Sequence, residues 1–285
     1  MKLVSFTRAG ENGFGAVVAN GIIDLTGRLG ANVTTIRSLL EQDLVAAAAD
    51  HVADRRPGLG WADVRLLPVV PNPGKILCIG LNYLDHKKET GRPDVQYPTV
   101  FTRYADTQIA HGQPLVKPAI SDRFDYEGEM AIVIGRPARN VPETEALDHV
   151  AGYSIYNDGS VRDWQRHTFQ FTPGKNFPGT GGFGPCLVTP DEIGDYRALG
   201  IETRLNGQVM QKASLRDLLF PLETLISYCS TFTPLAPGDV IVTGTPGGVG
   251  DKRTPPVYMV PGDVAEIQID KLGILRNPVV SEEAP

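Results

Sequence analysis

Two glutamates, Glu127 and Glu129, lie two positions apart in the segment DYEGEMAIVIG, residues 125–135. If residues 126–134 form a β-strand, both carboxylates point to the same face, roughly 6 to 7 Å apart. Like charges on a strand that continues as apolar residues destabilise each other unless a cation lies between them. The pattern predicts a cation site, and the alternative is an exposed strand end that carries two ordinary surface glutamates.

A second polar cluster, YNDGSVRDWQ (residues 156–165), ends the apolar segment 150–156. Its Asp158 would complete a set of three carboxylates with the two glutamates. Oxygen ligands without His or Cys favour Mg²⁺, Mn²⁺ or Ca²⁺ over zinc. Three protein ligands also leave coordination positions open for water or substrate, so we expect a metal site that takes part in chemistry.

A third cluster, GLNYLDHKKE (residues 80–89), contains His86 and Glu89. Three residues apart on a helix, the two lie on one face, where the carboxylate can orient the imidazole and raise its basicity. Such a pair can act as a general base. A solvated helix face with an ion pair between these residues accounts for the same spacing.

Several common classes of functional site are excluded, because the chain lacks the motifs that define them. The segment GTGGFG (179–184) matches the GxGxxG pattern, but no strand precedes it and Pro185 follows it, so it is not a dinucleotide-binding turn. The segment TGTPGGVGDK (243–252) lacks the GK[ST] of a P-loop, and the chain has no HExxH or GxSxG motif. The three cysteines are far apart and suit neither a disulfide framework nor a zinc finger.

The composition is that of a globular chain of 285 residues with a formal net charge of −6. A negative chain without a visible basic patch argues against nucleic acid and anionic membranes as partners. The N-terminus lacks the apolar stretch of a signal peptide, and no apolar run approaches the roughly 20 residues that span a bilayer. We therefore expect a cytoplasmic protein.

The elements that must position these clusters are short, because 31 glycines and 23 prolines interrupt the chain often. The alternating apolar pattern predicts a β-rich α+β fold. The proline-rich stretch 66–74 indicates a linker, which divides the chain into a small N-terminal α+β domain, residues 1–70, and a larger domain, residues 71–285.

In the small domain we expect a helix over residues 34–54 and three strands, at 2–6, 14–19 and 22–25. Asn20-Gly21 is the signal for a tight hairpin between the last two strands. In the larger domain a helical stretch, 214–232, is interrupted by Pro221, and Asn206-Gly207 predicts a second hairpin. The expected strands there lie in the segments 75–81, 130–135, 153–158, 184–189, 201–211, 238–244 and 263–270.

From about residue 75 to 280, six features in order resemble the fumarylacetoacetate hydrolase family. They are GLNYLDHKKE, DYEGEMAIVIG, NDGSVRDWQ, Lys175, NGQVMQ and PGDVIVTGTPGGVG. The resemblance implies a fold of mixed β-sandwich or roll type, Mg²⁺ or Mn²⁺ as the cofactor, and a homodimer. It also implies cleavage or rearrangement of a small anionic 2,4-dioxo acid.

The resemblance assigns roles residue by residue. The implied metal ligands are Glu127, Glu129 and Asp158. The implied catalytic residues are His86, Glu89 and Lys175. The implied substrate contacts are Arg162, Gln165, Thr245, Tyr83 and Arg103. The alternatives are a solvated Lys175, an Arg162 that pairs only with Asp163, and a pocket-lining His167.

Two departures from the family pattern concern the substrate pocket. The usual KGFDTF-like stretch is GKNFPGTGGFGP here, and the common F-x-K is Phe101-Thr102-Arg103. We therefore expect a pocket that differs from those of the best-known members.

The expected reaction is metal-assisted hydrolysis of a carbon–carbon bond in an acylpyruvate, which releases pyruvate and a carboxylic acid. The polar segment 162–172 favours a hydroxylated acyl chain. A 2,4-dioxo-3-deoxy sugar acid of the L-rhamnonate type is therefore the first candidate substrate, and fumarylpyruvate is the second. Oxaloacetate decarboxylation, isomerisation of hydroxymuconate-type diacids and ureidoglycolate cleavage are further activities that the resemblance implies. The alternative from another class is a ligand-binding scaffold without catalysis.

Overall fold

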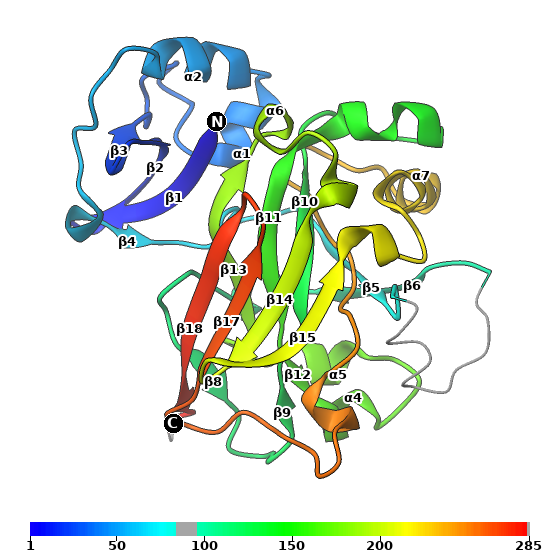
Figure 1. Cartoon of the computed structure of the whole chain (residues 1–285). Helices are drawn as coiled ribbons and strands as arrows, with labels where there is room; N and C mark the ends of the chain where they lie inside the picture. The colour runs from blue at the N-terminus through cyan, green and yellow to red at the C-terminus, as the bar shows by residue number, and fades with distance from the viewer. Residues whose placement is uncertain (84–95, 284–285) are drawn as a thin grey trace.

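The computed structural model describes residues 1–83 and 96–283 (Figure 1). Within these ranges the chain forms two large β-sheets and a separate two-stranded pair, with short helices around them. The larger sheet has eleven strands, most of which follow the order β3-β2-β1-β13-β11-β10-β16-β5-β6. The smaller sheet has five strands in the order β15-β14-β17-β18-β8. The expected β-rich α+β fold is confirmed.

The strands have the following bounds. The larger sheet contains β1 (Lys2–Arg8), β2 (Glu11–Val18), β3 (Gly21–Asp24), β4 (Arg65–Leu66), β5 (Ile76–Gly80), β6 (Thr99–Arg103), β7 (Gln108–Ile109), β10 (Gly128–Ile134), β11 (Val150–Asp158), β13 (Gly181–Val188) and β16 (Val240–Val242). The smaller sheet contains β8 (Leu115–Lys117), β14 (Gly200–Leu205), β15 (Gln208–Ser214), β17 (Val264–Ile269) and β18 (Gly273–Ser281). A separate pair consists of β9 (Phe124–Asp125) and β12 (Ser160–Val161).

The helices are short. The α-helices are α1 (Ile36–Glu41), α2 (Val45–Val52), α4 (Arg162–Gln165), α5 (Thr172–Lys175), α6 (Pro190–Ile193) and α7 (Leu222–Phe232). The 3₁₀ turns are η1 (Trp61–Asp63), η2 (Ala105–Thr107), η3 (Glu143–His149), η4 (Tyr196–Ala198), η5 (Leu215–Asp217) and η6 (Gly250–Lys252). None of the helices in the described part of the chain is long and apolar enough to cross a membrane.

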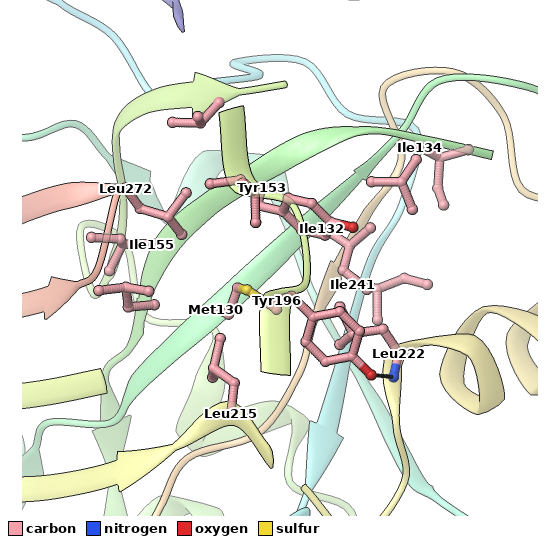
Figure 2. Packing of buried hydrophobic residues seen from close by; sticks show 14 of the residues in the cluster. Met130, Ile132, Ile134, Tyr153, Ile155, Tyr196, Leu215, Leu222, Ile241 and Leu272 are labelled. Atoms are coloured by element: carbon pink, nitrogen blue, oxygen red, sulfur yellow. Dashed lines mark hydrogen bonds between the residues drawn. The ribbon is translucent and has the colours of Figure 1, made fainter. Parts of the chain in front are cut away.

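The strand β10 lies between two hydrophobic cores, and its side chains alternate between them. Met130 and Ile132 belong to the core that the larger sheet shares with strands of the smaller sheet, as Figure 2 shows for the cluster around Tyr153. Ala131 and Val133 belong to the other core, which includes residues of α1 and α2. Since every residue of β10 is buried, the strand holds Glu129, and Glu127 directly before it, in a fixed place.

The first 70 residues join the larger sheet directly. Strand β1 pairs with β13, with Lys2 opposite Val188 and Leu3 opposite Leu187. The predicted boundary at residue 70 falls in the segment between β4 and β5, and it stays a prediction about folding units. What the structure adds is that the hairpin of β1 and β2 extends the same sheet that carries β10 and β11.

Two local predictions need correction. The expected helix over 34–54 is two helices, α1 and α2, because Asp43 takes a positive φ of 52° and ends the first one. The first hairpin turns at Ala19-Asn20, one residue before the expected Asn20-Gly21, since Val18 pairs with Gly21. The second hairpin turns at Asn206-Gly207 as expected, with positive φ at both residues.

Candidate metal centre

The carboxylates of Glu127, Glu129 and Asp158 meet where β10 begins and β11 ends. The two strands are antiparallel neighbours, so the start of one lies beside the end of the other. The backbone N–H of Asp158 donates to the carbonyl of Glu127 over 2.9 Å. One oxygen from each of the three carboxylates lies within 4.8 Å of the others, and all three residues are buried.

The donor set fits a divalent cation, because it consists only of carboxylate oxygens. Burial, together with the charges of Asp158 and Glu127, raises the pKa of Glu129 well above its ordinary value. Glu129 accepts a hydrogen bond from the N–H of Gly244 over 2.5 Å. Within residues 1–83 and 96–283 it forms no ion pair with Lys or Arg, unlike Glu127 and Asp158. A bound cation would therefore supply the positively charged partner that the carboxylate of Glu129 lacks.

Lys175 lies beside two of the carboxylates. Its Nζ is 2.7 Å from Glu127 Oε2 and 2.5 Å from Asp158 Oδ2, and it lies 5.0 Å from the ring centroid of Phe101. Burial acts to lower the pKa of Lys175, but Asp158 and Glu127 outweigh it and raise the pKa. The alternative of a solvated Lys175 is excluded, since the residue is only 1% exposed. The side chain brings a permanent positive charge to the site.

Arg162 connects the carboxylates to a second buried acid, Asp125. Its Nε donates to Asp125 Oδ2 over 2.8 Å, and its Nη1 lies 2.6 Å from Glu127 Oε1. Nη1 also donates to Gln165 Oε1 over 3.0 Å. Asp163 accepts from Ser121 instead, so an arginine that pairs only with Asp163 is excluded.

Arg103 lies behind Asp158, away from any solvent. Its Nη1 donates to Asp158 Oδ1 over 2.7 Å and to the carbonyl of Gly159 over 3.0 Å, and its Nη2 donates to Thr180 Oγ1 over 2.7 Å. None of its side chain is exposed. Arg103, expected to contact substrate, thus orients Asp158, a predicted metal ligand, and does not line the pocket described below.

Thr245 lies next to the start of β10 and is held there by Gln211. Its Oγ1 donates to the carbonyl of Gly128 over 3.0 Å and accepts from Gln211 Nε2 over 2.7 Å. Gln211 also accepts from the N–H of Gly128 over 3.0 Å and donates to the carbonyl of Pro246 over 2.8 Å. One glutamine therefore links the segment after β16 to the start of β10, beside the predicted metal ligands Glu127 and Glu129.

The remaining predicted residues do not join this cluster. Tyr83 is 1% exposed and lines a different cavity, on the side of Pro246–Gly248 with Lys212 and Asp217. His167 is exposed and packs against Trp164, with ring centroids 4.8 Å apart. His86 and Glu89 lie outside the described residues.

A pocket of about 200 Å³ opens onto the cluster. Its buried part, which we call the inner wall, is lined by Glu127, Glu129, Lys175 and the rings of Phe101 and Phe171. Its exposed part, which we call the mouth, is lined by Arg166, Asp251 and Lys252. Arg162, Gln165 and Thr245 also line the pocket, so three of the five predicted substrate contacts face it.

The sequence reading assigned no role to Asp125, Gln211, Asp251 or Lys252. Asp125 had a detectable signal, because it continues the alternation of Glu127 and Glu129. The other three lie in segments quoted above, Gln211 at the end of NGQVMQ and Asp251 and Lys252 at the end of TGTPGGVGDK, but no pattern in those segments predicts that these residues reach the site. Gln211 comes from β15, whereas Asp251 and Lys252 come from η6.

Comparison with known proteins gives one family for most of the chain. The family model described as fumarylacetoacetate (FAA) hydrolase C-terminal matches residues 75–280. An oxaloacetate tautomerase of Xenopus laevis, named as mitochondrial, is 39% identical over 91% of this chain and 82% of its own.

Similar solved structures cover nearly the whole chain, and they include hydrolases. A fumarylacetoacetate hydrolase from Exiguobacterium antarcticum is 34% identical, with a TM-score of 0.87, over 99% of this chain and 100% of its own. A maleylpyruvate hydrolase from Sphingobium sp. SYK-6, solved with manganese(II) and pyruvate, is 28% identical, with a TM-score of 0.83 and the same coverage. The structure with manganese supports a divalent metal as the group that the carboxylate cluster would bind.

Proposed function

Because this chain belongs to the fumarylacetoacetate hydrolase family, we propose that it is a divalent-metal-dependent enzyme for a small 2-oxo dicarboxylic acid, and that it interconverts the keto and enol forms of oxaloacetate or a close analogue. The observation that carries the proposal is the carboxylate cluster at the inner wall, whose three buried carboxylates lie beside the buried cations Lys175 and Arg162. This arrangement suits an anion whose 2-oxo oxygen gains negative charge during the reaction.

Glu127, Glu129 and Asp158 would hold the metal ion, which supplies a Lewis acid for the 2-oxo group when bound. Lys175 remains protonated, because its pKa is raised, and its charge stabilises an enolate oxygen. Phe101 and Phe171 cover the inner wall and reduce the access of water. A base removes the proton from C3 of the keto acid, and protonation of the resulting enolate on oxygen gives the enol. His86, paired with Glu89, is the base that the sequence predicts.

The pocket favours a short substrate over a sugar acid. The polar segment 162–172 suggested a hydroxylated acyl chain, but Thr168, Phe169 and Gln170 are exposed and do not line the pocket. A cavity of about 200 Å³ also lies below the range of about 300 to 1,000 Å³ that is usual for larger ligands. A four- or five-carbon diacid fits this volume better.

Hydrolysis of an acylpyruvate is the second candidate function, and the predicted pair of His86 and Glu89 favours it. Here the pair would activate a water that attacks the 4-carbonyl. The C3–C4 bond then breaks, the acyl group leaves as a carboxylic acid, and protonation of the pyruvate enolate at C3 gives pyruvate. Fumarylpyruvate and the dioxo sugar acid are substrates of this alternative. The hydrolases among the similar structures support it.

One set of assays separates the two candidates. The first follows the enol of oxaloacetate by its ultraviolet absorbance, with Mg²⁺ or Mn²⁺ and with EDTA. The second measures pyruvate release from a panel of 2,4-dioxo acids and from oxaloacetate. A metal-dependent acceleration of tautomerisation without pyruvate release supports the proposal. Pyruvate from the dioxo acids supports hydrolysis, pyruvate from oxaloacetate supports decarboxylation, and no reaction in any assay contradicts both candidates.

The homodimer and the cytoplasmic location stay predictions. Light scattering coupled to size-exclusion chromatography measures the first, and fractionation of cells that express the tagged chain measures the second. A monomer would contradict the dimer that the resemblance implies.

A further inference from the structure

The mouth of the pocket is fixed to the inner wall through Asp125. The backbone N–H groups of Gly250 and Asp251 donate to the two oxygens of Asp125, over 2.9 and 3.0 Å. Asp125 in turn accepts from Arg162, which contacts Glu127. The turn η6, which ends at Lys252, is therefore held at a defined position relative to the metal ligands.

Three of the four cations that line the pocket already have partner carboxylates. Lys175 pairs with Glu127 and Asp158, and Arg162 pairs with Asp125 and Glu127. The charges of those two cations are thus matched by buried carboxylates, and the other two lining cations lie at the mouth.

At the mouth, Arg166 pairs with both carboxylate oxygens of Asp251, which also accepts from the hydroxyl of Tyr258 over 2.9 Å. Lys252 is exposed, and among the residues that the structure describes its ammonium group has no hydrogen-bond or ion-pair partner. Lys252 is therefore the lining cation whose charge is not matched within the described chain.

The charge of the whole lining points to a dianion. Five carboxylates carry the negative charge here: Glu127, Glu129 and Asp251 in the lining, with Asp125 and Asp158 behind it. The four lining cations and Arg103, which pairs with Asp158, balance them, so a divalent ion at the carboxylates would leave an excess of two positive charges. A 2-oxo monoacid neutralises only one charge, near the metal. A second carboxylate at the far end of the substrate would reach the mouth, where the unmatched ammonium group lies.

We propose that Lys252 is a specificity-determining residue that binds the distal carboxylate of a dicarboxylic substrate. The inference rests on the proposed function, because it assumes that the 2-oxo end of the substrate lies at the inner wall. Arg166 contributes less, since its charge is balanced by Asp251. Because Lys252 is exposed, its contribution is modest and sensitive to salt.

The test compares two ligands of equal chain length, 2-oxoglutarate and 2-oxopentanoate, which differ by a carboxylate in place of a methyl group. Their affinities for the Mn²⁺-loaded protein are measured by titration calorimetry at low and high salt. We expect the wild-type protein to prefer the diacid by about tenfold at low salt, and Lys252→Met to remove most of that preference without weakening 2-oxopentanoate binding. The preference should also shrink at high salt.

Lys212→Met is the matched control, because Lys212 is 74% exposed, carries the same charge and does not line this pocket. It should keep the wild-type ratio of affinities. The inference is overturned if the wild-type protein shows no preference, if Lys252→Met keeps it, or if both ligands weaken equally. Binding does not require turnover, so a negative tautomerase assay with an intact ratio would overturn the proposed function alone.

Discussion

The inner wall and the mouth of the pocket are built in opposite ways. The inner wall lies at the start of β10 and the end of α5, where Glu127 and Lys175 are buried and each contacts more than one charged partner. The mouth lies at α4 and η6, where Arg166 is 48% exposed and Lys252 is exposed. The paired strands cannot shift register without moving every side chain, whereas a short turn can change a residue at little cost. The predicted metal ligands are thus fixed by the sheet, whereas the residues proposed to select the substrate lie in segments at its edge.

The largest expected effect is at the inner wall, with Glu129→Gln. The substitution keeps the size of the side chain but removes a negative charge from the donor set, so Mn²⁺ affinity should fall by at least about 100-fold, within the range expected when a metal ligand or its support is lost. Titration calorimetry measures the affinity, and circular dichroism should show an unchanged fold. Glu202→Gln, on β14 of the other sheet, is the control. Unchanged Mn²⁺ binding by Glu129→Gln would contradict the ligand assignment.

The second effect concerns the strand that supports the inner wall. A Cβ on Gly128 would overlap Oγ1 of Thr203 on β14, so Gly128→Ala must push the two sheets apart. We expect a loss of about 1 to 3 kcal/mol in unfolding free energy, together with weaker Mn²⁺ binding. The hydroxyl of Thr203 has no hydrogen-bond partner in the described structure, so Thr203→Ala should partly restore both properties in the double variant. A double variant no better than Gly128→Ala would contradict the steric explanation.

The third effect tests the link between the two regions. Gln211→Met keeps the approximate volume but leaves the N–H of Gly128 without its acceptor and frees Thr245. Unfolding free energy should fall by about 1 to 3 kcal/mol, the cost of an unsatisfied buried group. We also expect kcat/KM to fall about tenfold with Mn²⁺ affinity nearly unchanged, because Thr245 and not the ligands loses its support. Gln268→Met, on β17, is the control. If Gln211→Met is as stable and as active as the wild-type protein, Gln211 does not support Thr245.

The smallest effect is at the mouth and depends on pH. Burial acts to raise the pKa of Asp251, but hydrogen bonds from Arg166 and Tyr258 outweigh it, so the pKa is lowered. The folded state therefore binds fewer protons than the unfolded state near the ordinary pKa of about 3.9. The resulting stabilisation is present above that pH and is lost as the pH falls through the lowered pKa. Asp251→Asn should narrow the difference in melting temperature between pH 6 and pH 3.

The control for that measurement is Asp122→Asn, which removes a carboxylate that is fully exposed. Scanning calorimetry of both variants separates the effect of the Arg166 pair from the general loss of a negative charge. If Asp251→Asn keeps the wild-type dependence on pH, the ion pair at the mouth does not stabilise the fold.

The sequence predicts local features of the structure, because these features depend on residues that are neighbours in the chain. The alternation expected for a strand over 126–134 predicts Glu127 and Glu129 on one side. In the structure β10 begins only at Gly128, directly after Glu127, and the two carboxylates still lie together. Pro221 interrupts the expected helical stretch 214–232, since only the 3₁₀ turn η5 forms before it and α7 begins directly after it. The Asn206-Gly207 turn needs only its own two residues. The departure at Ala19-Asn20 has a tertiary origin, because the pairing of β2 with β3 decides which two residues form the turn.

By itself, the sequence determined the donor chemistry of the site and the family to which the chain belongs. Only the tertiary structure decided that Arg103 orients Asp158 from behind, that Gln211 supports Thr245, and that Lys252 reaches the same pocket as the metal ligands. The physical reason is the distance along the chain over which each kind of interaction acts. Backbone periodicity acts over a few residues, whereas these contacts join strands and turns that are distant in the chain, and they exist only once the sheets have paired and packed.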